Sequence, residues 1–284
     1  MLVAPDYKLQ CGSKLVDLSR PVVMGVLNVT PDSFSDGGRY QTLSSALSQA
    51  ETMAREGAVF VDVGGESTRP GALSVSLDEE LFRVIPVIEA ISKNIDVVIS
   101  VDTSRPQVMQ EAARAGAGLI NDVRALGLEG ALEMATTLQL PVCLMHMQGQ
   151  PQTMQKRPAY TDVVRDVLEF LVQRAELCKA VGMDRQAILL DPGLGFGKTP
   201  HHNLSLLKEL EILVAAGYPV LIGASRKSMI GAVLNKPIEQ RMNGGLAIAS
   251  VAALKGAKII RTHDVAPTVE VLQMTAAIMY GHAE

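Results

Sequence analysis

Charged and amide side chains stand at or just past the ends of eight short apolar segments in this sequence. Runs of Val, Ile and Leu of this kind form strands buried on both faces, where an ionisable group is costly. The residues are Asn28, Asp62 with Glu66, Asp102, Asn121 with Asp122, His146, Asp191, Lys227, Arg261 and His263. A single Asp or Asn after a strand is about as often a helix cap as it is a site residue. So many polar residues at strand ends together predict one polar site.

Two cations in the last apolar segment indicate an anion-binding site. Arg261 and His263 flank Thr262 and therefore face the same side of an extended chain. The motif SRKS adds Arg226 and Lys227 after the preceding apolar segment. The Gly-rich segment DPGLGFGK resembles a phosphate loop but lacks the Walker A spacing. We therefore expect a phosphorylated ligand, with carboxylates deeper in the site.

The other histidines carry a weaker signal. His146 follows an apolar segment, and its position favours packing or a supporting contact over catalysis. The sequence context of His201, His202 and His282 predicts surface residues.

These polar residues need a scaffold that brings eight strand ends together. The apolar segments begin near Val22, Val59, Val97, Leu119, Pro141, Ala187, Pro219 and Lys258, with helical segments between them. An eightfold alternation of strand and helix predicts an α/β fold of the TIM (β/α)₈ barrel type, whose active site lies at the C-terminal ends of the strands. A doubly wound Rossmann sheet is disfavoured, because the first turn, NVTPDSFSDGG, has no G-x-G-x-x-G motif.

No linker, low-complexity tract or charge block divides the chain, so we expect residues 1–284 to form a single domain. Residues 1–20 form a short N-terminal extension, in which YKLQCGSKLVDL predicts a hairpin that caps the barrel floor. Gly follows helix C-termini, and Pro enters helices in the first turn. We expect helix ends before Gly57, Gly116, Gly182 and Gly256, helix starts at Pro106 and Pro267, and a cap at Thr161 or Asp162.

Composition excludes several classes of protein. The net charge of −4 argues against a nucleic-acid groove, which needs clustered Lys and Arg. The three cysteines, Cys11, Cys143 and Cys178, are odd in number and form no C-x-x-C pair, so a disulfide framework is not expected. Neither a signal peptide nor an apolar run of about 20 residues is present, so we expect a cytoplasmic protein without a membrane partner.

The motifs of the strand ends resemble those of one family, the bacterial dihydropteroate synthases of folate biosynthesis. The resemblance covers nearly the whole chain. The motifs, in order, are GVLNVTPDSFSDGG, DVGGESTRPGA, ISVDTSRPQV, INDVRAL, CLMHMQGQPQTMQ, LLDPGLGFGK, ASRKSMIG and IIRTHDV. It implies a TIM-barrel transferase that condenses 6-hydroxymethyl-7,8-dihydropterin diphosphate with p-aminobenzoate to 7,8-dihydropteroate and pyrophosphate.

The resemblance also implies roles for individual residues. Asp102, Asn121 and Asp191 would bind the edge of the pterin, with Lys227 at its carbonyl side and Arg261 against its face. The diphosphate would lie on Asn28, Arg261 and His263, and Mg²⁺ on Asn28 and phosphate oxygens. Because the catalytic set is then Asn28, Lys227, Arg261 and His263, no protein nucleophile is needed, and the path would be SN1-like.

The p-aminobenzoate slot would be formed by Phe34, Thr68, Arg69, Pro70, Phe196 and Ser228, with Lys227. The resemblance implies inhibition by sulfonamides and a homodimer formed through helices of the C-terminal half. Two alternatives remain open: a pterin-binding methyltransferase module, which would need a corrinoid partner, and a non-catalytic pterin-binding relative. The STRPG loop and the SRKS motif argue against the first, and the retention of Asn28, Lys227 and Arg261 argues against the second.

Overall fold

The computed structural model describes residues 7–29, 39–67 and 74–281. Within them, eight parallel strands form one sheet in the order β8-β7-β6-β5-β4-β3-β10-β9. A bridge between Leu190 and Val220 joins the two edge strands and closes the sheet. The strands are β3 (Val22–Asn28), β4 (Phe60–Gly64), β5 (Val98–Asp102), β6 (Leu119–Asp122), β7 (Val142–Met145), β8 (Ile188–Asp191), β9 (Leu221–Gly223) and β10 (Ile259–Thr262). The fold is a TIM barrel, as predicted.

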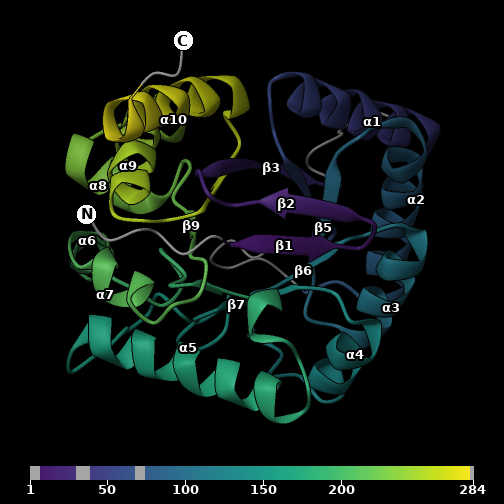
Figure 1. The fold of residues 1–284 in the computed structure, drawn as a ribbon, viewed down its shortest axis with the longest axis horizontal. Coiled ribbons are helices and arrows are strands. Elements are labelled where there is room, and N and C mark those ends of the chain that lie inside the picture. The colour runs from purple at the N-terminus through teal and green to yellow at the C-terminus, as the bar shows by residue number, and fades with distance from the viewer. Residues whose placement is uncertain (1–6, 30–38, 68–73, 282–284) are drawn as a thin grey trace.

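Helices surround the barrel (Figure 1). They are α1 (Arg39–Arg55), α2 (Leu77–Asn94), α3 (Pro106–Ala115), α4 (Ala131–Leu138), α5 (Val163–Ala180), α6 (Pro200–Lys208), α7 (Leu210–Val214), α8 (Ser228–Leu234), α9 (Met242–Leu254) and α10 (Val265–Tyr280). Short 3-10 turns, η2 (Arg185–Ala187) and η3 (Ile238–Gln240), precede β8 and α9. In the described part of the chain, no helix is both long and apolar enough to cross a membrane.

Helix boundaries follow the expected local chemistry with one exception. The side chain of Asp162 accepts hydrogen bonds from two backbone N–H groups at the start of α5, and Gly116 adopts the left-handed conformation after α3. The expected start of the last helix at Pro267 was wrong, because α10 begins at Val265. Proline is tolerated within a first turn, where its missing N–H has no partner in the helix.

The N-terminal extension forms an antiparallel hairpin of β1 (Lys8–Cys11) and β2 (Lys14–Asp17), which lies across the ring of helices in Figure 1. Its buried side chains, Leu9, Cys11 and Val16, form one apolar cluster together with Leu18 and with residues from the N-terminal halves of the barrel strands. The strand residues are Met24, Phe60, Val98, Leu119, Cys143, Leu189, Leu221 and Ile259. The N-terminal end of the barrel is therefore filled mainly with apolar groups, whereas the carboxylates of the barrel strands lie toward the other end.

Candidate active site

Asp62 lies at the centre of a hydrogen-bonded network at the C-terminal end of the barrel. Its strand neighbour in register, Ser100, donates to Asp62 Oδ1 over 2.5 Å. Asn121 Nδ2, from β6, donates to Asp62 Oδ2 over 3.1 Å. The carboxylate is fully buried and still has a charged partner in Arg261. The Asp62 side chain of β4 is thus hydrogen-bonded to side chains of β5 and β6.

Arg261 of β10 reaches across the barrel mouth to two carboxylates. Its Nε donates to Asp62 Oδ2 over 2.6 Å, and its Nη2 donates to Asp102 Oδ2 over 2.9 Å. Burial alone would lower the pKa of the guanidinium, but the two carboxylates together raise it above its ordinary value. Burial, reinforced by the charge of Asp62, raises the pKa of Asp102 to about 7, against the opposing effect of Arg261. Arg261 therefore stays charged, while Asp102 is only partly compensated.

Asp191 and Lys227 form a second part of the site at the C-terminal end of the barrel. Asp191 Oδ1 accepts a 2.7 Å hydrogen bond from the backbone N–H of Gly193, and burial raises the pKa of this carboxyl group although Lys227 opposes the shift. Burial likewise lowers the pKa of Lys227 to about 8, against the opposing charge of Asp191. The Lys227 ammonium donates to the carbonyl of Leu194 and lies 4.7 Å from the ring centroid of Phe196.

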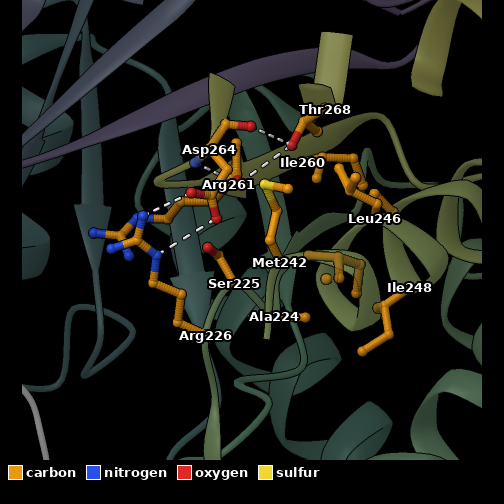
Figure 2. A pocket seen from close by; sticks show the side chains of 14 residues that line it. Ala224, Ser225, Arg226, Met242, Leu246, Ile248, Ile260, Arg261, Asp264 and Thr268 are labelled. Atoms are coloured by element: carbon orange, nitrogen blue, oxygen red, sulfur yellow. Dashed lines mark hydrogen bonds and ion pairs between the residues drawn. The ribbon is translucent and has the colours of Figure 1, made fainter. Parts of the chain in front are cut away.

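The loops after β9 and β10 form the cationic rim. The backbone N–H of His263 donates to Ser225 Oγ over 3.2 Å, and its Nδ1 lies 3.1 Å from the same oxygen. The guanidinium of Arg226 pairs with Asp264 over 2.6 Å, as Figure 2 shows. The narrow space beside this pair, lined in part by Met242, holds about 10 Å³, roughly one water molecule. The space drawn in Figure 2 is therefore too small to be a ligand site.

The remaining predicted site residues divide into described and undescribed ones. Asn28 ends β3, is half-buried and lies opposite Gly64 in register. Phe196 is half-buried in the loop after β8, and Ser228 is exposed as the first residue of α8. Phe34, Thr68, Arg69 and Pro70 lie outside the described residues.

No individual role was predicted for Asp62 or Lys198, although Asp62 was among the polar residues expected at the strand ends. Lys198 is buried, and its Nζ lies 2.8 Å from His146 Nδ1. For Asp122 the simpler explanation applies: its carboxylate accepts backbone N–H bonds from Arg124 and Leu126, both over 2.8 Å. Asp122 therefore shapes a turn, whereas Asp62 aligns groups of the site.

Comparisons with known proteins agree with this geometry. A family model described as "Pterin binding enzyme" matches residues 24–263. The dihydropteroate synthase of Haemophilus influenzae is 54% identical over 270 residues, which cover 95% of this chain and 98% of that protein. The Escherichia coli enzyme of the same name is 52% identical over 272 residues, which cover 96% of each chain.

Solved structures share the fold over nearly its full length. Yersinia pestis dihydropteroate synthase in a sulfonamide complex is 52% identical, with a TM-score of 0.91 over 96% of this chain and 99% of that one. Xanthomonas albilineans dihydropteroate synthase with 4-aminobenzoic acid is 46% identical, with a TM-score of 0.92 and coverage of 97% and 99%. The same enzyme with 7,8-dihydropteroate is 44% identical, with a TM-score of 0.89 and coverage of 96% and 99%.

Proposed function

The chain belongs to the dihydropteroate synthase family, and from this premise we propose that it condenses 6-hydroxymethyl-7,8-dihydropterin diphosphate with p-aminobenzoate. The products would be 7,8-dihydropteroate and pyrophosphate. The observation that carries the proposal is a buried layer of carboxylate and amide groups at the C-terminal end of the barrel. The guanidinium of Arg261 donates hydrogen bonds to two of these carboxylates. Solved relatives bind 4-aminobenzoic acid and 7,8-dihydropteroate, which fits these two substrate classes.

The pterin would lie on Asp102, Asn121 and Asp191. A carboxylate that faces two adjacent N–H donors forms strong paired hydrogen bonds. The raised pKa values of Asp102 and Asp191 support this role, because burial has left both charges incompletely compensated. A ligand that donates N–H groups would stabilise the ionised forms. The planar cation of Arg261 could stack on the flat heterocycle while it keeps its carboxylate partners.

The diphosphate would occupy the rim formed by Asn28, Arg261 and His263, with Mg²⁺ on the amide oxygen of Asn28. Among the described residues, no group of three or more His, Cys, Asp or Glu could hold a metal. A single amide oxygen at the end of β3 fits Mg²⁺, which commonly keeps several waters and takes further oxygens from phosphate. When bound, the ion would neutralise charge that develops on the leaving diphosphate.

The reaction would break the bond between the exocyclic methylene carbon and the diphosphate oxygen, which leaves with the electron pair. Arg261 and His263 would stabilise the negative charge that develops there. The electron-rich pterin can carry the positive charge of the methylene, which makes the path SN1-like. The amine nitrogen of p-aminobenzoate then forms the new C–N bond and loses one proton. Protein groups would act by placement and electrostatics.

The p-aminobenzoate slot would lie beside Lys227 and Phe196 and near Ser228 at the start of α8. The Lys227 ammonium lies 4.7 Å from the centroid of the Phe196 ring, so the two side chains can form adjacent walls of this slot. The predicted contributions of Phe34, Thr68, Arg69 and Pro70 remain part of the proposal. Sulfonamides would compete for this slot.

We also propose a homodimer. The outer faces of α9 and α10 expose large apolar side chains, with Leu254 51%, Met274 63% and Ile278 70% exposed. These two helices lie next to each other on one side of the barrel in Figure 1. Large apolar side chains exposed on two neighbouring helices are typical of a protein interface.

Product formation tests the proposed function directly. The purified chain is incubated with pterin diphosphate, p-aminobenzoate and Mg²⁺, and both dihydropteroate and pyrophosphate are measured. We expect equal amounts of the two products, no turnover after Mg²⁺ is chelated, and a raised KM for p-aminobenzoate in the presence of a sulfonamide. A folded chain that forms neither product would overturn the proposal.

A further inference from the structure

The ammonium group of Lys198 is buried between two loops at the mouth of the barrel. The side chain is 2% exposed, and its Nζ contacts His146 Nδ1 at 2.8 Å, the Phe196 carbonyl at 3.1 Å and the His146 carbonyl at 3.3 Å. An ammonium has three N–H donors, so these three acceptors satisfy it completely. His146 belongs to the loop after β7, whereas Phe196 and Lys198 belong to the loop after β8.

The two loops also touch along their backbones. A side chain at Gly193 would overlap the carbonyl oxygen of His146, and one at Gly197 would overlap that of Gln148. Both glycines adopt positive φ, +65° and +64°, which other residues rarely do. Tyr160, near the end of the loop after β7, adds a 2.8 Å hydrogen bond from its hydroxyl to the carbonyl of Gly197. The loop after β8 is therefore shaped against the loop after β7.

This shape bears on Lys227, which contacts two residues of the loop after β8. The Lys227 ammonium donates to the carbonyl of Leu194 and lies over the ring of Phe196. Lys198 holds the carbonyl of Phe196 in place. A shift of Phe196 would thus move both the aromatic wall of the proposed slot and the cation beside it.

We infer that Lys198 is a positioning residue of this site: by joining the loops after β7 and β8 through His146 and Phe196, it holds Lys227 and the aromatic wall of the aminobenzoate slot in place. The slot itself rests on the proposed function, but the clamp between the loops can be measured without substrate. An ammonium can only donate, so His146 must carry its proton on Nε2 and accept at Nδ1.

The first test is the tautomer of His146, read from the ¹⁵N chemical shifts of its ring in the ligand-free protein. We expect an unprotonated Nδ1 at pH 6, where Lys198 is protonated although burial lowers its pKa to about 7. In Lys198→Met the Nδ1 resonance should shift, because its donor is lost. A protonated Nδ1 in the wild-type chain, or an unchanged resonance in the variant, would overturn the inference even if the chain had no catalytic activity.

The second test separates binding of the two substrates. Lys198→Met should raise the KM for p-aminobenzoate at least tenfold and raise the Kd of the unphosphorylated pterin by a smaller factor, because Lys227 is one of several groups proposed to bind the pterin. Lys198→Arg, which keeps a cation, should recover part of the loss. Lys208→Met, at an exposed position of α6, serves as the matched control and should leave both constants unchanged. Equal changes in the two constants, or none, would contradict a positioning role.

If Lys198→Met does not fold, His146→Gln takes its place in the second measurement, and the first rests on the tautomer in the wild-type chain. It removes the imidazole acceptor and leaves the two carbonyl acceptors of the ammonium in place. We then expect a smaller rise in the KM for p-aminobenzoate, with a Kd for the pterin close to that of the wild-type chain. An unchanged KM would overturn the inference.

Discussion

Asp62 is the most completely paired carboxylate of the site, and its partners explain how Arg261 is held. One oxygen accepts from Ser100, and the other accepts from both Asn121 and Arg261. A buried charge is stable only when such partners are present. This pairing, together with the bond to Asp102, fixes the orientation of the Arg261 guanidinium. Asp62 is thus a positioning residue for the cation that would face the pterin and the diphosphate.

Asp62→Asn should destabilise the protein and loosen Arg261. The substitution keeps the shape but removes one charge of a buried pair, which typically costs about 3 kcal/mol. The free energy of unfolding in urea measures this loss. Glu111→Gln is the control, because the Glu111–Arg114 pair is exposed and should contribute less than about 1 kcal/mol. Equal losses of unfolding free energy in the two variants would show that the buried pair of Asp62 stabilises the protein no more than an exposed pair does.

His146 should make the protein sensitive to acid. Burial, assisted by the charge of Lys198, lowers the pKa of His146 to about 3 from its ordinary 6.5. As the pH falls from 6.5 to 3, the unfolded chain therefore binds a proton that the folded chain does not, and stability declines. Each pKa unit corresponds to about 1.4 kcal/mol, so the group contributes several kcal/mol over this window.

His146→Gln removes this titration and tests the prediction. Its unfolding free energy, measured between pH 7 and pH 4, should fall less steeply than that of the wild-type chain. Parallel curves for the two proteins would mean that His146 titrates in the folded chain as it does in the unfolded chain. The comparison of slopes also cancels any constant loss of stability that the substitution causes.

At the scale of elements, the strands and the hairpin could be predicted because each has a local pattern. Eight apolar runs and a Gly-centred turn between two short strands are visible in the sequence. The pairing of Asp62 could not be predicted, since its partners come from β5, β6 and β10 and only the closed barrel brings them together. Lys198 lies outside any strand, and no spacing links it to His146.

The hairpin should contribute to stability by closing the barrel floor. Leu18 is fully buried in the cluster that joins the hairpin to the strands, and Leu18→Ala should cost about 2–5 kcal/mol. Leu15, on the same hairpin, is 60% exposed, and Leu15→Ala should change stability by about 0.5 kcal/mol or less. Urea unfolding compares the two variants. A hairpin that packs only loosely on the barrel would give similar small losses for both.

At the scale of the whole molecule, the two ends of the barrel differ in chemistry: one stabilises the fold, and the other holds the proposed site. The N-terminal end is closed by apolar packing with the hairpin, and the C-terminal end collects the carboxylates and cations. A net charge of −4 is compatible with a cationic rim, because the rim holds only a few of the chain's charged groups. The described carboxylates and cations of the site come from the strands and loops of one barrel.

The association of two such protomers can be tested through α10. Ile278 is 70% exposed, and Ile278→Glu places a charge on the proposed interface, where a desolvated carboxylate is costly. By sedimentation, the wild-type chain should have twice the 30.3 kDa mass of one chain, whereas the variant should sediment as a monomer. Leu15→Glu, at an exposed apolar position of the hairpin, should remain a dimer. Because the described carboxylates and cations of the proposed site belong to one barrel, we expect the monomeric variant to keep its turnover. A wild-type monomer at high protein concentration would contradict the proposed assembly.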